Sequence, residues 1–463
     1  MTDNSPARKR LQLDRVFPGR DPRLDFFRGL ALWFIFLDHV PGNLFAWLTP
    51  RNWGFSDATE IFIFISGYSA AIAYGRAWQR NGLPWASAHV WQRAWTLYVA
   101  HLVLLMFFIA EVAFVATRYG NPAFVDELNL NEFLKAPHIA LVEALLLRFK
   151  PANLDVLPLY IVLLCAFPLM LALIGWRPRW LLAISVAVYA AARGFGWNLP
   201  AFPGEGGWFF NPFAWQLLFV LGAVCAAAPQ ALGEAFRWRR WVAWLAAGWL
   251  LFSLAVVLTW HVRALEDALP IWLGNLIYPI DKTNLGLTRL THFLAIAYLA
   301  SGLIPANARF LARRRVRPIL VCGRQSLYVF CFGIYLSFFM QFVLVEVDAS
   351  LAAQALCSGV GIAAMCALAA LIDWYGAAGK KKGGAREAVA VRDGGAAVPV
   401  ADASAAASPA AAMPSTVTAA SSATTAIAPT TTPSAASGAD ATGPNPIQPR
   451  SAALPSDIAG ARP

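Results

Sequence analysis

Long apolar stretches alternate with short polar connections from residue 25 to residue 374. A helix needs roughly 20 apolar residues to cross the hydrocarbon core of a bilayer, and about ten stretches approach that length. This pattern predicts an all-α integral membrane protein, a polytopic bundle of about ten transmembrane helices. The predicted spans are residues 25–48, 57–74, 94–115, 155–174, 180–193, 211–228, 241–260, 287–304, 319–345 and 351–374.

The two ends of the chain lack this pattern. Residues 1–24 are polar and basic, and no small-residue cleavage site follows the first apolar stretch. We therefore expect a membrane anchor that is retained rather than a cleaved signal peptide. Beyond residue 376, Ala, Ser, Thr, Pro and Gly dominate, a composition that cannot bury a core. The sequence thus predicts a basic cytoplasmic N-terminal segment (1–24), a membrane domain (25–375) and a disordered cytoplasmic tail (376–463).

Composition and charge narrow the function class. Hydrophobic residues make up 58% of the chain and charged residues 14%, whereas soluble domains average roughly 25% charged residues. This composition argues against a soluble enzyme of this size. The net charge of +11 comes from basic residues in alternate connections, which predicts membrane lipids rather than nucleic acid as partners and places both termini in the cytoplasm. The six Cys show no zinc-type spacing, so we expect no metal and no bound cofactor.

Charged residues inside the first span are the leading functional candidates, because a charge at mid-membrane costs roughly 2.5–3.5 kcal/mol. Arg28 and His39 lie eleven residues apart, about three helical turns, so they share a face and are separated by about 16 Å. His39 can accept a proton from a hydroxyl, Asp38 or another carboxylate can orient it, and Arg28 can hold an anionic group. The alternative interpretation is that Arg28 extends to the membrane surface and His39 forms a structural hydrogen bond.

Two further groups of polar residues extend this hypothesis to both sides of the membrane. Arg76 and Arg93, with Arg28, can bind a phosphorylated donor on the cytoplasmic side, or they can be topology signals only. Polar residues near the outer side can bind the hydroxyl groups of an acceptor, or they can belong to ordinary solvated loops. These acceptor-side candidates are Asn43, Glu60, Asp281, Lys282, Asn284 and His292.

Several stretches of the chain resemble a known family, the OpgC family of succinyltransferases that modify osmoregulated periplasmic glucans. That family is similar to the larger acyltransferase-3 superfamily of multi-spanning membrane acyltransferases. The resemblance covers roughly residues 20–374. The matching stretches are Arg20–Leu32, Phe36–Asn43, Arg51–Glu60, Phe64–Tyr68, Leu157–Tyr160, Asp281–Gly286 and Gly323–Tyr328.

The resemblance implies a location in the bacterial inner membrane, an acyl-CoA donor on the cytoplasmic side, with succinyl-CoA as the implied donor, and a periplasmic glycan acceptor. Arg28 and His39 match the arginine–histidine signature of the superfamily, which implies that His39 is a general base or a transient acyl carrier. Many superfamily members carry a second arginine three residues after the one matched by Arg93. Here Thr96 occupies that position, which weakens the match at the donor side.

A second function class remains open from the sequence. A transporter or flippase could move a glycan or an acyl carrier across the membrane without chemistry. Such a protein usually shows internal repeats, and no repeat is evident in this chain. A structural scaffold would leave the intramembrane Arg28–His39 pair unexplained. Turnover of acyl-CoA by the purified protein distinguishes the enzyme from both alternatives.

Overall fold

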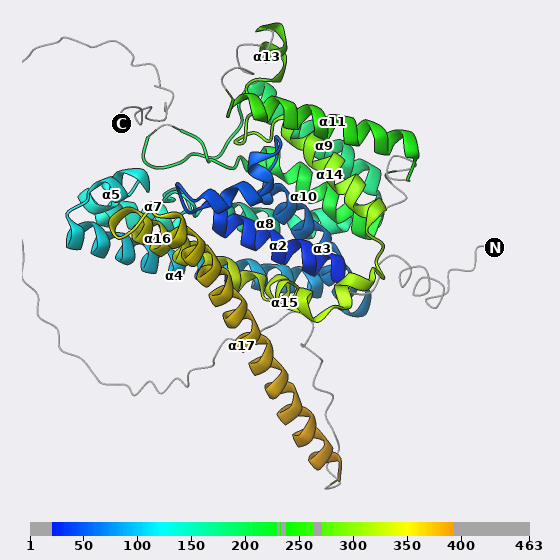
Figure 1. Cartoon of the computed structure of the whole chain (residues 1–463). Coiled ribbons are helices and arrows are strands. Elements are labelled where there is room, and N and C mark those ends of the chain that lie inside the picture. The colour runs from blue at the N-terminus through cyan, green and yellow to red at the C-terminus, as the bar shows by residue number, and fades with distance from the viewer. Residues whose placement is uncertain (1–20, 205, 229–231, 233–237, 263–270, 393–463) are drawn as a thin grey trace, which may run out of the picture. The chain divides into compact units, whose positions relative to one another are not determined.

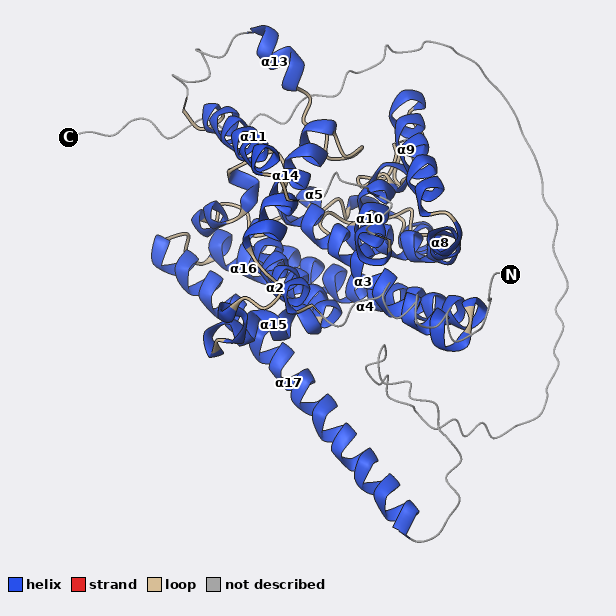
Figure 2. Cartoon of the chain, turned by 90° about the vertical axis from the view of Figure 1, so that its right-hand side faces the viewer, coloured by secondary structure: helices blue, strands red, loops and turns tan. Residues whose placement is uncertain are grey.

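A computed structural model (Figure 1) describes residues 21–204, 206–228, 232, 238–262 and 271–392. Every named element among these residues is a helix (Figure 2). The only β-type pairing in this part of the chain consists of two isolated bridges in the loops around residues 149, 202 and 207. The all-α prediction is therefore confirmed for the described residues.

Six of the helices are long and apolar enough to cross a membrane, and a seventh apolar helix is shorter. Three other predicted spans are helical, but these helices are not both long enough and apolar enough to be counted with the six. The six helices agree with the prediction of a membrane protein. The number of ten membrane crossings stays a prediction. The six are α3 (Ala58–Asn81), α4 (Leu83–Tyr119), α8 (Val156–Trp176), α11 (Arg240–Thr259), α16 (Ser326–Glu346) and α17 (Leu351–Arg392); the shorter helices are α10 (Pro212–Ala227), α2 (Pro22–Asp38), α9 (Pro178–Phe195) and α14 (Leu287–Leu303).

Two predicted spans differ from the observed helices. The first was expected to continue to residue 48, but α2 ends at Asp38 because Pro41 lacks a backbone N–H and clashes with a continuing helix. The chain then turns through Gly42, whose φ is +70°, into the 3-10 helices η1 (Leu44–Leu48) and η2 (Pro50–Asn52). The predicted span 319–345 is divided at Gln325 into α15 (Arg317–Arg324) and α16.

The last helix also differs from the expected boundary. Helix α17 continues to Arg392, so residues 376–392, expected to open the disordered tail, are helical. This segment contains many Ala, Lys, Arg and Glu residues, which favour helix and outweigh its glycines. Residues 1–20, which form most of the predicted N-terminal segment, and residues 393–463 lie outside the described residues. Short helices occupy the connections: α5 (Ala123–Glu127), α6 (Asn131–Lys135), α7 (Pro137–Leu145), α13 (Ile271–Ile277), η4 (Arg309–Ala312) and η5 (Arg314–Val316).

Glycines allow two pairs of helices to approach closely. A Cβ atom on Gly67 of α3 would lie 2.0 Å from the carbonyl oxygen of Phe219 in α10, and one on Gly222 would lie 2.1 Å from that of Phe64. The same arrangement joins α2 to α15, since a Cβ on Gly29 would meet the backbone of α15 at 2.0 Å. Close backbone contact of this kind holds membrane helices together, so α2 and α3 are fixed by their neighbours.

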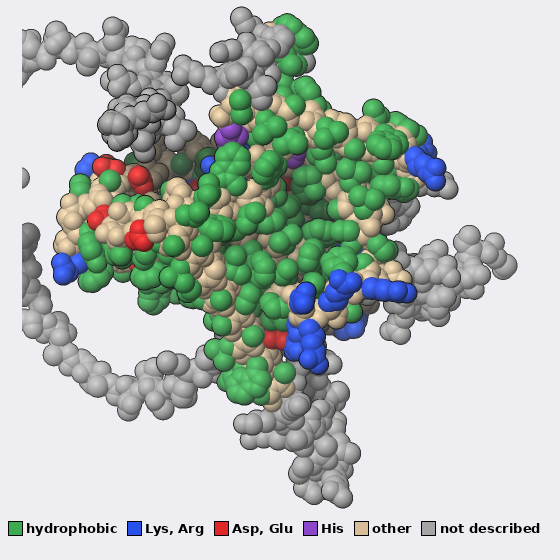
Figure 3. All heavy atoms as spheres, viewed as in Figure 1, with side chains coloured by type: hydrophobic (Ala, Val, Ile, Leu, Met, Phe, Trp, Pro, Cys, Tyr) green, Lys and Arg blue, Asp and Glu red, His purple; other side chains and the backbone are tan. Residues whose placement is uncertain are grey.

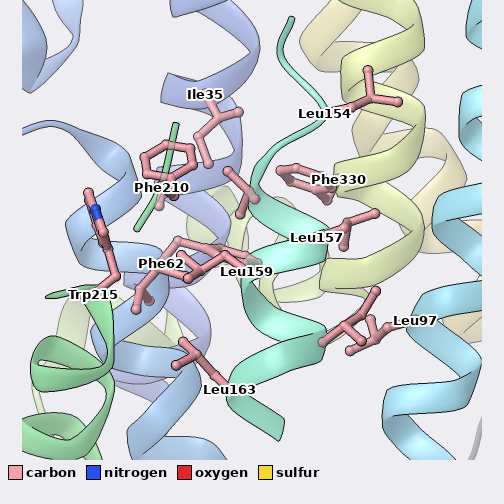
Figure 4. Close-up of a cluster of buried hydrophobic side chains, with 14 of the residues drawn as sticks. Ile35, Phe62, Leu97, Leu154, Leu157, Leu159, Leu163, Phe210, Trp215 and Phe330 are labelled. Atoms are coloured by element: carbon pink, nitrogen blue, oxygen red, sulfur yellow. The ribbon is translucent and has the colours of Figure 1, made fainter. Parts of the chain in front are cut away.

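The hydrophobic core lies where five helices meet (Figure 4). Its side chains include Ile35 of α2, Phe62 of α3, Leu97 of α4, Leu157 of α8 and Phe330 of α16, all buried. Such packing permits little movement of the backbone that carries it. The last turn of α2, which includes Ile35, is therefore a rigid support for the residues that follow it.

Charged residues are unevenly distributed over the surface shown in Figure 3. Hydrophobic side chains cover most of this face, while Lys and Arg side chains gather around α15 and acidic ones near α5. Exposed arginines lie in the segment that precedes α15 and at its first residue: Arg309, Arg313, Arg314, Arg315 and Arg317. This separation is typical of a membrane protein whose basic connections lie on one side of the bilayer.

Candidate functional site

His39 caps the C-terminal end of α2, and its ring bonds to the same helix. Its Nδ1 atom lies 2.6 Å from the carbonyl oxygen of Ile35. A carbonyl oxygen can only accept, so in the neutral imidazole the proton must be on Nδ1. Nε2 therefore keeps its lone pair and can act as a base. Because Ile35 is packed in the core, the orientation of the His39 ring is fixed by the backbone, and the side chain itself is only partly buried.

Asp38 is adjacent to His39 in sequence but has different partners. Its carboxylate accepts a hydrogen bond of 2.6 Å from the Thr49 hydroxyl, and its backbone carbonyl accepts one of 3.3 Å from Arg51. Successive residues of a helix point about 100° apart, which explains why the two side chains separate at the end of α2. We expected Asp38 or another carboxylate to orient His39. In the structure the backbone carbonyl of Ile35 makes this contact instead.

Arg28 connects α2 to α3. Its guanidinium donates to the Ser69 hydroxyl and, at 3.3 Å, to the carbonyl oxygen of Ile65. The charges of both Arg28 and Arg93 act on Tyr160 of α8. Arg76 lies seven residues after Ser69, about 10 Å farther along the same face of α3. Of the three arginines, Arg28 belongs to α2, Arg76 to α3 and Arg93 to α4.

A buried ion cluster joins the start of α3 to α14. Glu60, which is completely buried, accepts hydrogen bonds from the Asp57 backbone N–H at 2.9 Å and from Arg289 Nε at 2.8 Å. Asp57 Oδ2 lies 3.0 Å from Arg289 Nη2 and 2.6 Å from Lys282 Nζ. Two carboxylates are thus matched by two cations. The charge of Arg289 at the start of a predicted span was a visible signal in the sequence, but its pairing with Glu60 was not.

The loop that carries Lys282 is held rigidly. Asn284 donates to both carboxylate oxygens of Asp281, through its backbone N–H at 3.1 Å and its amide at 2.8 Å. The amide oxygen of Asn284 accepts from Asn211 at 2.8 Å, and the Trp215 indole donates to the backbone carbonyl of Lys282 at 3.1 Å. Asp281 and Asn284 therefore shape the turn. The side chain of Lys282, which is 33% exposed, extends from this turn to its ion pair with Asp57.

Two other acceptor-side candidates have structural partners. The Nδ1 atom of His292 lies 2.7 Å from the Ser56 hydroxyl and accepts the Ser56 backbone N–H at 3.3 Å. Asn43 caps η1 by accepting from the Phe45 N–H at 3.0 Å and donates at 3.0 Å to Ser358 of α17. Both side chains are buried. His292 thus holds the loop that precedes α3, and Asn43 joins η1 to α17.

The residues that the structure brings together around His39 form a compact electrostatic group. The charges of Lys282, Asp57 and Arg51 all act on the imidazole. Lys282 and Asp57 are paired, and Arg51 bonds to the carbonyl of Asp38. An imidazole with one available nitrogen thus lies near two cations and one carboxylate. Such a nitrogen can activate a hydroxyl group by accepting its proton. Among the described residues, no group of three His, Cys, Asp or Glu side chains could hold a metal ion.

Comparison with known proteins gives one match. A family model described as OpgC protein matches residues 20–377. These residues include the whole of the bundle from α2 to the apolar part of α17, and with it every candidate site residue. No curated protein and no solved structure is significantly similar to the chain.

Proposed function

Because the chain belongs to the OpgC protein family, we propose that it is a membrane O-acyltransferase that modifies a glucan. In this proposal an acyl group, with succinyl as the favoured identity, passes from cytoplasmic acyl-CoA to a hydroxyl of a periplasmic glucan. The protein would lie in the bacterial inner membrane with both termini in the cytoplasm. The family match supports acyl transfer to a glucan, and the residues around His39 support the chemistry.

The observation that carries the proposal is the contact between His39 Nδ1 and the Ile35 carbonyl. This contact leaves Nε2 unprotonated and fixes the direction of its lone pair. In the proposed step, the acceptor O–H gives its proton to Nε2 while its oxygen bonds to the thioester carbonyl carbon. The tetrahedral intermediate then expels the CoA sulfur, which takes the proton from the imidazolium. The products are a glycan ester and CoA–SH, and His39 returns to its starting state.

The arginines indicate where the acyl-CoA donor would bind. Arg28 and Arg93 both act on Tyr160, and positive charge at this point suits the phosphate groups of CoA. The distance along α2 from Arg28 to His39 is about 16 Å. The thin pantetheine arm of acyl-CoA can cover such a distance and deliver the thioester to His39. We propose the same role for Arg76, farther along α3.

The test is transfer of a radiolabelled acyl group by the purified protein in liposomes. Acyl-CoA carrying the label in its acyl group is added on one side and a glucan on the other, and labelled glucan is counted. Parallel reactions with succinyl-CoA and acetyl-CoA identify the acyl group. Transfer that requires the protein supports the proposal. A folded protein that releases no CoA from any donor would refute it and favour the transporter alternative.

A further inference from the structure

Three aromatic rings meet at the loop that follows α2. Trp47 lies in η1, Trp53 caps the end of η2, and His261 follows the end of α11. Between ring centres, Trp47 lies 4.4 Å from His261 and 6.0 Å from Trp53. Trp47 therefore joins its two neighbours into one surface, which we call the aromatic platform and which consists of Trp47, Trp53 and His261.

The aromatic platform is accessible, and the loop that carries it is held in place. Trp53 is 46% exposed and His261 is also exposed, while Trp47 between them is half-buried. The Trp53 indole N–H donates to the Trp47 carbonyl at 2.5 Å, and the Asn52 amide donates to the Ala46 carbonyl at 2.9 Å. A ligand would therefore meet a surface that is already formed, which lowers the entropy cost of binding.

Two hydrogen bonds connect this loop to the end of α2 at His39. The Thr49 hydroxyl donates to the Asp38 carboxylate at 2.6 Å, and Arg51 donates to the Asp38 backbone carbonyl at 3.3 Å. That carbonyl belongs to the peptide bond between Asp38 and His39. Thr49 and Arg51 are each two positions from a tryptophan of the platform, a backbone distance of about 7 Å at most. The platform and the proposed base are thus close enough for neighbouring rings of one oligosaccharide.

A positively charged side chain lies at the edge of the platform. Arg51 is exposed, and its hydrogen bond to Asp38 uses one of the five N–H groups of the guanidinium. Within the part of the chain that the structure describes, Arg51 forms no ion pair. Hydrogen-bond donors therefore remain available next to the exposed ring faces.

The orientation of Trp53 differs from that of a membrane-interface anchor. Such a tryptophan presents its indole N–H to lipid headgroups or water. The Trp53 N–H is instead bonded to the Trp47 carbonyl, so the exposed part of its ring consists of carbon and C–H groups. A lipid acyl chain on this ring would leave Arg51 without a partner, and a lipid phosphate on Arg51 would leave the ring faces uncovered.

We propose that the aromatic platform is a sugar-binding subsite, which holds one ring of the acceptor while a neighbouring ring is acylated at His39. A sugar ring has a face of C–H groups, which packs on the negative face of an aromatic ring. Its hydroxyl groups project from the edge and can accept hydrogen bonds from Arg51. A sugar therefore matches both the ring faces and the charged edge. The subsite rests on the proposed function, since it assigns the acceptor to a place.

The experiment measures binding directly. A radiolabelled glucose hexasaccharide is equilibrated by dialysis with the full-length protein in a detergent that has no sugar headgroup. Trp53→Ala should raise Kd about tenfold, the effect of losing one aromatic contact, whereas Trp53→Phe keeps a ring face and should keep most of the affinity. Trp244→Ala, which removes a tryptophan of α11 that is 77% exposed, is the matched control and should leave Kd unchanged. Equal melting temperatures show that the variants are folded.

The outcomes separate this inference from the proposed function. Failure of the wild-type protein to bind the hexasaccharide, or an unchanged Kd in Trp53→Ala, overturns the subsite whether or not acyl transfer occurs, and assigns the rings to the membrane interface. Weaker binding by Trp53→Ala, with no acyl transfer by any form, supports the subsite and refutes the transferase. Where transfer occurs, Trp53→Ala should raise KM for the hexasaccharide and leave KM for acyl-CoA unchanged.

Discussion

Replacement of His39 by Asn tests the base directly. The Asn amide nitrogen corresponds in position to Nδ1, so it can still donate to the Ile35 carbonyl, but nothing replaces Nε2. General-base catalysis contributes about 10²–10⁴-fold, which corresponds to roughly 2.7–5.4 kcal/mol of transition-state stabilisation. Because the hydrogen bond to Ile35 is retained, the loss of stability should be well below the roughly 1 kcal/mol that a lost hydrogen bond costs.

A comparison of two variants separates the chemistry from the structure. His39→Ala removes both the base and the Ile35 contact, whereas His39→Asn removes the base alone. If Nε2 is the base, both variants should lower kcat for acyl transfer in liposomes by a similar factor of at least about 100. His138→Ala, at an exposed position near the start of α7, is the matched control and should keep full activity.

One result would rule out Nε2 of His39 as the base. If His39→Asn kept kcat within a few-fold of the unsubstituted protein while His39→Ala was inactive, the histidine would act by holding the end of α2. Proton transfer by Nε2 would then have to be abandoned. The assay must use equal amounts of membrane-inserted protein, with folding checked by thermal melting.

Three other substitutions test the remaining parts of the structure. Arg289→Gln leaves the completely buried Glu60 without its cation, so the protein should lose about 3–5 kcal/mol of stability, seen as a lower melting temperature in detergent. Gly222→Val places side-chain atoms against the Phe64 carbonyl and should cost about 1–3 kcal/mol, seen as less folded protein in size-exclusion chromatography. Arg28→Ala should raise KM for acyl-CoA more than it lowers kcat, as steady-state kinetics will show; an unchanged KM would remove Arg28 from donor binding.

Some features of the site were visible in the sequence because they depend on local spacing. Arg28 lies within α2 and His39 caps the C-terminal end of the same helix, and Lys282 of the polar segment 281–284 pairs with Asp57 at the start of α3. The roles of these residues in catalysis and binding stay predictions. Pro41, whose missing N–H ends the helix, was also visible in the sequence.

Other features could not be predicted because their partners are far apart in the chain. The hydrogen bond between Arg289 and Glu60 spans 229 residues, and a charge pattern alone does not identify such a pair. The group that orients His39 is a backbone carbonyl, which every residue has. Likewise, the contact between Trp47 and His261 depends on how a loop and the end of α11 meet. The sequence thus predicted the elements and the candidate groups, and tertiary packing decided which of them met.

The ion cluster has a consequence for the synthesis and membrane assembly of the protein. Glu60 leaves the ribosome 229 residues before Arg289, and at 5–20 residues per second this delay is on the order of 10–45 seconds. Throughout this time α3 carries a carboxylate whose final partner does not yet exist. The start of α3 must therefore wait at the membrane surface, or enter the translocon with the acid uncharged. Arrival of α14 then supplies the cation, so the N-terminal helices complete their assembly only when the second half of the chain is synthesised.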